Sequence, residues 1–127
     1  MRGKSAFTLI EVLAVCLILI IAVVGTLGVF SVSFSLNQGS KNTIIALSDA
    51  SSVLESMRNI DPFSIASLLA GYPNGSTLGG YANLSSETVQ VNYADTSADP
   101  LQATVTVTWH EKTRVRTEKL VALFTGR

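Results

Sequence analysis

The chain has few of the residues, cysteine and histidine, that cross-link small folds or build catalytic and metal centres. It contains one cysteine and one histidine among 127 residues, so an intrachain disulfide is excluded and a metal centre of several such ligands is not expected. It shows no Ser–His–Asp order with supporting motifs and no phosphate-binding glycine loop. We therefore expect no enzyme and no cofactor. The formal net charge is zero, which gives no sign of affinity for nucleic acid or anionic lipid.

Charge is missing altogether from one long stretch, Val12–Phe30, whose only polar side chain is Thr26. As a helix these 19 residues would measure about 28 Å, close to the ~30 Å core of a bilayer. Arg2 and Lys4 precede the stretch, so the positive-inside tendency keeps the N-terminus in the cytoplasm and exports the remainder. A secretory signal peptide, with a weak cleavage site at 31–33, is the alternative.

Proline is missing before Pro62, and helical periodicity continues beyond the apolar stretch. Apolar side chains recur at spacings of three and four residues. They are Ile44, Leu47, Ala50, Leu54 and Met57. Polar residues between them, such as Asp49, are expected to point away from this stripe. We predict one helix over about 7–59 and a short second helix over 63–70, with Asp61 as its N-cap.

The C-terminal half alternates apolar and polar residues, which predicts strands. The predicted strands are 89–93, 101–109 and 114–124, with a loop at 71–80 and a turn at 110–113 that contains His110. Imperfect alternation predicts a bulge near Glu118 and Lys119. The lone His110 is not expected to bind a metal.

One face of the predicted sheet and one face of the helix need cover, and packing one on the other satisfies both. The sheet face carries Leu101, Val105, Val107 and Trp109. The predicted fold class is α+β: a long N-terminal helix, its first half transmembrane, packed on a small antiparallel sheet of about three strands.

A carboxylate, Glu11, stands at the entrance to the apolar stretch. Ionisable groups in membrane helices are costly and are functional by default, so a partner should be named. No lysine or arginine follows Glu11 on the membrane side. The partner is therefore expected to come from another molecule, and a protonated or interface-seeking carboxylate is the alternative.

The residues around it, "AFTLIEVLAV" after a short basic leader, resemble the class III signal of type IV pilins and secretion pseudopilins. Family members have a hydrophilic leader that is cleaved before a residue that is usually phenylalanine, and a glutamate four residues after it. The resemblance implies cleavage between Ala6 and Phe7 by prepilin peptidase, N-methylation of Phe7, and a role for Glu11 in subunit assembly. The family strongly prefers glycine at the position that Ala6 occupies here.

Weaker similarities in "LESMRN" and in the closing hairpin point to two branches. These are the minor pilins of the pilus-modification (PilV-like) group and minor pseudopilin I of type II secretion. The resemblance implies a cleaved leader at 1–6, a transmembrane and filament-core half-helix at 7–30, and an exported α+β head at 31–127. It implies a non-catalytic subunit in the inner (cytoplasmic) membrane and then in a filament. The implied partners are other pilins or pseudopilins, prepilin peptidase and the assembly platform.

The C-terminal hairpin is basic, and its candidate phosphate contacts are Lys112, Arg114 and Arg116. Arg114 and Arg116 should share a face of the last strand. A second interpretation is therefore a tip module that binds DNA or a surface through this hairpin. The simpler interpretation is a solvated strand face that blunts edge pairing.

Overall fold

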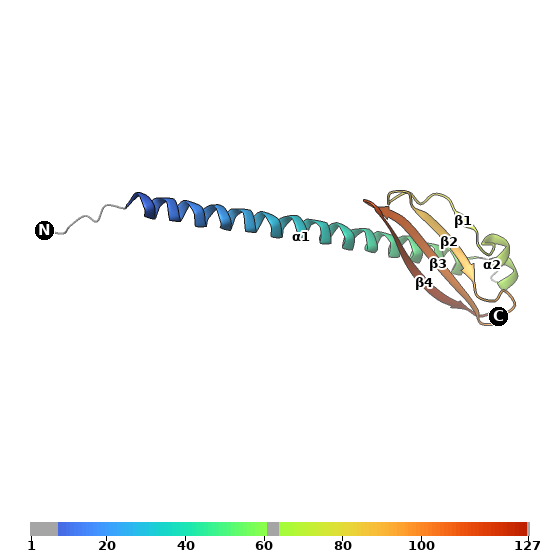
Figure 1. Cartoon of the computed structure of the whole chain (residues 1–127). Helices are drawn as coiled ribbons and strands as arrows, with labels where there is room; N and C mark the ends of the chain where they lie inside the picture. The colour runs from blue at the N-terminus through green and yellow to red at the C-terminus, as the bar shows by residue number, and fades with distance from the viewer. Residues whose placement is uncertain (1–7, 61–63, 127) are drawn as a thin grey trace. The chain divides into compact units, whose positions relative to one another are not determined.

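The computed structural model describes residues 8–60 and 64–126. Its elements are α1 (Leu9–Arg58), α2 (Ile65–Gly71), β1 (Thr77–Leu78), β2 (Thr88–Tyr93), β3 (Leu101–Glu111) and β4 (Arg114–Phe124) (Figure 1). The chain divides into two compact units, Met1–Gln38 and Gly39–Arg127, and α1 contributes to both.

The first unit is the apolar part of α1. The two glycines in the stretch, Gly25 and Gly28, leave the helix continuous. The hydroxyl of Thr26 donates to the carbonyl oxygen of Val23 at 2.8 Å, so the polar side chain of the stretch is satisfied within the helix. The prediction of a single helix over 7–59 is confirmed for Leu9–Arg58.

The second unit is built on an antiparallel sheet of order β1-β2-β3-β4. β3 and β4 pair without interruption from Leu101 opposite Phe124 to Glu111 opposite Arg114. The predicted bulge is therefore wrong: Glu118 takes its place in the ladder opposite Val107. The polar residue interrupts the alternation because this part of the strand's inner face is only half-buried.

The sheet has four strands instead of the predicted three. The extra strand, β1, is two residues long and lies in the predicted loop, where Thr77 pairs with Gln90 and Leu78 with Val89. Two residues are too few to show an alternation. His110 lies in β3 and not in the turn, because the hairpin closes through only two residues, 112–113.

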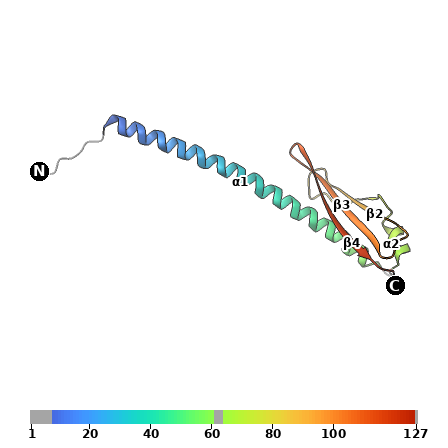
Figure 2. The same cartoon turned by 60° about the horizontal axis from the view of Figure 1, so that its bottom comes forward.

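The core lies between the sheet and the second part of α1 (Figure 2). This arrangement was predicted from the apolar face that the sheet and the helix each present. From β2 and β3 it takes Val89, Val91, Tyr93, Leu101, Ala103, Val105, Val107 and Trp109. From α1 it takes Ala46, Ala50, Val53, Leu54 and Met57.

The helix is rotated relative to the predicted stripe. Ile44 is 67% exposed and Leu47 is 36% exposed, whereas Asp49, expected to face water, is 8% exposed. The helix presents the small Ala46 and Ala50 to the sheet, so that its backbone can approach the branched side chains of the strands. The predicted stripe is therefore confirmed for Ala50, Leu54 and Met57 and wrong for Ile44 and Leu47.

The short helix α2 begins later than predicted, because Ser64 and not Asp61 is its N-cap. The Ser64 hydroxyl accepts from the Ser67 amide, and the Ser67 hydroxyl accepts from the Ser64 amide, each at 3.0 Å, which forms a capping box. Asp61 and Pro62 lie outside the described residues. At the other end, the Tyr93 hydroxyl donates to the Tyr72 carbonyl at 2.9 Å, and burial raises the pKa of Tyr93 to about 12.

Candidate functional site

Glu11 lies in the first turn of α1 and is exposed. Thr8 precedes the helix, and its carbonyl oxygen accepts from the amides of Glu11 at 3.0 Å and Val12 at 3.2 Å. A carboxylate in a first turn interacts favourably with the partial positive charge of the helix N-terminus. Local structure therefore accommodates Glu11 but leaves open why an acid stands before an apolar stretch.

The side chains that follow Glu11 are apolar on every side of the helix. Eighteen large apolar side chains from Leu9 to Leu36 are exposed in the described part of the chain. A helix that is apolar all round is normally covered by other protein or by lipid. Burying each such side chain contributes about 1.5–3 kcal/mol, so the first part of α1 requires a cover that contacts among the described residues do not supply.

Among the described residues, α1 is the one helix long and apolar enough to cross a membrane, judged by length and composition. The next basic residue in the sequence after Glu11 is Lys41. It lies 30 residues further along α1, or about 45 Å at ~1.5 Å per residue. The helix itself therefore offers Glu11 no counter-charge within the apolar stretch. Ala6 and Phe7 lie outside the described residues, so their processing remains a prediction.

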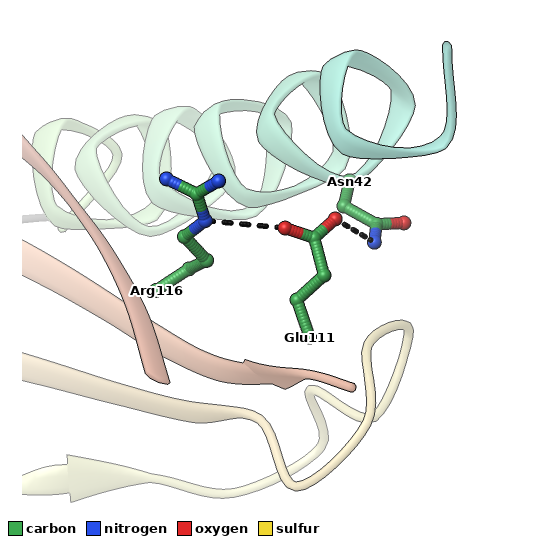
Figure 3. A network of polar contacts seen from close by, with 3 residues as sticks. All are labelled: Asn42, Glu111 and Arg116. Carbon is green, nitrogen blue, oxygen red and sulfur yellow. Dashed lines mark hydrogen bonds and ion pairs between the residues drawn. The ribbon is translucent and has the colours of Figure 1, made fainter. Parts of the chain in front are cut away.

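The end of the basic hairpin is tied to α1 by a polar network (Figure 3). Arg116 Nε donates to Glu111 Oε2 at 3.1 Å, and Asn42 Nδ2 donates to Glu111 Oε1 at 3.2 Å. Glu111 thus joins two strands of the hairpin to the helix. This network was not predictable from the sequence, because Asn42 and Glu111 are 69 positions apart and neither belongs to a motif.

The basic residues of the hairpin are spread over different surfaces. The register confirms that Arg114 and Arg116 share a face, since they lie opposite Glu111 and Trp109. The alternation places Lys119, opposite Thr106, on the other face, and Arg116 is already paired with Glu111. Lys112 lies in the turn and Arg114 at the start of β4, and both are exposed, so a phosphate-binding role for Lys112, Arg114 and Arg116 stays a prediction.

The described ranges contain no group of three or more His, Cys, Asp or Glu residues that would hold a metal ion. Comparisons of the chain with protein-family models, with curated proteins and with solved structures give no match. The candidate site is therefore argued from the residues of this chain: Glu11, the exposed apolar helix behind it, and the segment that precedes Thr8.

Proposed function

We propose that this chain is a minor pilin or pseudopilin, a non-catalytic subunit that helps to assemble or prime a type IV pilus or a type II secretion pseudopilus. The observation that carries the proposal is a lone carboxylate, Glu11, in the first turn of a helix whose apolar side chains are exposed all round. The sequence "FTLIEV" that contains it resembles the processing signal of that family. A sheet packed on the second part of an N-terminal helix is compatible with a pilin-like fold.

In this proposal the subunit passes through two stages, membrane insertion and incorporation into a filament. In the first, the apolar part of α1 crosses the inner membrane with the N-terminus in the cytoplasm and the α+β unit exported. In the second, prepilin peptidase removes residues 1–6, Phe7 becomes the N-terminus, and the subunit is extracted into a filament by the assembly platform. The exposed apolar side chains are covered by lipid in the first stage and by neighbouring helices in the second.

In the filament, Glu11 would neutralise the new amine of Phe7 on a neighbouring subunit. At ~4 Å and an effective dielectric constant near 20, such a pair is worth about 4 kcal/mol before desolvation. Leaving either charge unpaired among apolar helices costs several kcal/mol. Because only one axial offset between two helices brings the charges together, the pair would set the register of stacking as well as add attraction.

The location of the chain tests the proposal. In the parent organism, a C-terminally tagged chain is expected both in the inner-membrane fraction and in filaments sheared from the cells. In a strain that lacks prepilin peptidase, the chain should keep its full length, remain in the membrane and be missing from the sheared fraction. Release of the chain as a soluble protein, independent of that peptidase, would contradict the proposal and favour an ordinary secretory signal.

A further inference from the structure

The tip of the β3–β4 hairpin lies at the end of the second unit where the chain enters it. Gly39 is the first residue of that unit, and α1 continues through it to Arg58. Glu111 Oε1 accepts from Asn42 Nδ2 at 3.2 Å, and a Cβ atom on Gly39 would lie 3.5 Å from the same oxygen (Figure 3). We call this surface, residues 39–42 of α1 and 110–116 of the hairpin, the entry end.

The entry end presents positive charge to solvent. Lys41, Lys112 and Arg114 are exposed. A fourth cationic side chain, Arg116, donates from Nε to Glu111 Oε2 at 3.1 Å and so offsets the carboxylate of this surface. Glu111 is itself half-buried against α1. The cationic side chains therefore dominate what this end shows to a partner.

The rest of the second unit has the opposite balance. Among its described residues, two side chains are cationic, Arg58 and Lys119, and six are carboxylates. The carboxylates are Asp49, Glu55, Glu87, Asp95, Asp99 and Glu118. Asp95 and Asp99 lie in the connection that leads into β3, at the strand end opposite the hairpin tip; the 11 residues of β3 span about 35 Å. The zero net charge of the whole chain thus conceals a positive end and a negative remainder.

The hairpin turn holds a lysine in a costly backbone conformation. Lys112 has a φ of 55°, a left-handed conformation that glycine adopts readily and that is unfavourable for a residue with a side chain. Such positions cluster where the side chain serves a binding or switching role. Here the lysine adds a cationic group at the tip of the hairpin.

Few residues separate the apolar stretch from the entry end. Gly39 lies nine residues after Phe30, the last residue of the uncharged stretch, or about 14 Å along α1 at ~1.5 Å per residue. The headgroup region on one side of a bilayer is about 5–8 Å thick, and the screening length in physiological salt is about 8 Å. With the apolar stretch in a membrane, the entry end is therefore within electrostatic range of the headgroups.

We propose that the entry end is a docking surface for anionic phospholipid: Lys41, Lys112 and Arg114 bind phosphate groups of the membrane that α1 crosses, and the acidic remainder of the unit faces away from it. The inference rests on the membrane stage of the proposed function, but not on assembly into a filament. Docking would hold the exported unit in one orientation at the membrane until the subunit is extracted.

The position of the cations favours a membrane over nucleic acid. They gather beside the segment that leads into the apolar stretch, and none of residues 39–42 and 110–116 is a phenylalanine, tyrosine or tryptophan that would stack on bases. A juxtamembrane cluster of lysine and arginine is instead typical of surfaces that attract anionic lipid.

Lipid retention by the full chain tests the proposal. The tagged chain is captured in a nonionic detergent with equal amounts of phosphatidylglycerol, which is anionic, and phosphatidylcholine, which is zwitterionic. The lipids that stay bound are measured by mass spectrometry. We expect wild type to prefer phosphatidylglycerol. The double variant Lys41→Gln with Arg114→Gln should reduce this preference by up to about 25-fold, since each cation near an anionic surface contributes up to about fivefold.

The matched control is the double variant Arg58→Gln with Lys119→Gln. It removes the same charge from exposed side chains outside the entry end, in the last turn of α1 and in the middle of β4. It should keep the preference of wild type, which separates the local surface from the net charge. Arg114→Gln alone should produce part of the loss, because only the fold brings this residue to the end of the unit where α1 enters.

Hydrogen exchange in vesicles reports on docking itself. With the full chain inserted, the amides of residues 110–116 should exchange more slowly in vesicles that contain phosphatidylglycerol than in vesicles of phosphatidylcholine alone. The difference should disappear in about 0.5 M salt, which shortens the screening length to about 4 Å. It should also disappear in the double variant of Lys41 and Arg114.

Equal lipid preferences of wild type and the Lys41 and Arg114 double variant would overturn the proposal, and so would an equal loss in the matched control. An Arg114→Gln variant that behaves as wild type would overturn it as well, because the hairpin would then take no part. Binding of duplex DNA that the double variant loses, with the lipid preference unchanged, would assign the surface to nucleic acid instead.

The same vesicles distinguish this failure from failure of the proposed function. A chain that alkaline washing removes from phosphatidylcholine vesicles is not inserted, and this result would contradict both the membrane stage and the docking surface. A chain that resists the washing but shows no preference for phosphatidylglycerol would contradict the docking surface alone.

Discussion

Replacing Glu11 with valine is expected to leave membrane insertion intact and to remove most of the chain from filaments. The substitution makes the apolar part of α1 more apolar, so insertion should not suffer. It deletes the proposed counter-charge of a neighbour's N-terminal amine, a pair worth about 4 kcal/mol before desolvation. At 1.4 kcal/mol per factor of ten, incorporation should weaken by up to about a thousandfold.

The controls for this experiment separate charge from apolarity. Thr26→Val also raises the apolarity of α1 but leaves Glu11 in place, and it should be incorporated as wild type is. Glu11→Asp keeps the charge on a shorter side chain and should recover part of the incorporation that valine loses. The measurement is the amount of chain in sheared filaments relative to the amount in membranes. Equal ratios for wild type and Glu11→Val would mean that Glu11 needs no partner in the filament.

Replacing Trp109 with alanine is expected to destabilise the second unit by about 3–5 kcal/mol. Trp109 is 2% exposed and is the largest of the fully buried side chains. It lies near the end of β3 where the hairpin meets α1, so the cavity would open between sheet and helix. The neighbouring strand cannot close it, since its residue opposite Trp109 is the charged Arg116.

Urea unfolding of the full chain in a nonionic detergent measures this effect. Trp109→Phe should cost less than alanine, because it keeps an aromatic ring and because the indole Nε1 has no hydrogen-bond partner to lose. Leu123→Ala, at a site that is 64% exposed on the same sheet, should change stability by no more than about 0.5 kcal/mol. An unchanged midpoint for Trp109→Ala would place this side chain outside the core and contradict the packing described above.

The elements with a strong repeating pattern were predictable from the sequence. α1 follows from an uninterrupted apolar stretch and a helical stripe, and β3 from the alternation between Leu101 and Trp109. The rotation of α1 was not predictable from the stripe alone. Ala50 belongs to the predicted stripe, but Ala46 is a weak hydrophobic signal outside it, and both are buried in the core.

The polar sites also differ in whether the sequence predicts them. Glu11 is conspicuous in the sequence because its neighbours are apolar and it belongs to a recognisable local motif. Asp49 and Asn83 are inconspicuous, since each resembles an ordinary surface residue until the fold brings them together across 34 positions. The Glu111 network depends likewise on a register between β3 and β4 that places Arg116 within reach. Long-range pairs of this kind carry no local signal.

The mass of the mature N-terminal peptide tests the central claim most directly. The account predicts that, in membranes and filaments of the parent organism, the chain begins at Phe7 and carries the mass of one added methyl group. Ala6→Gly should speed this cleavage, and a bulky residue at position 6 should stop it. A chain that still begins at Met1, or one that begins after Ser33, would contradict the account.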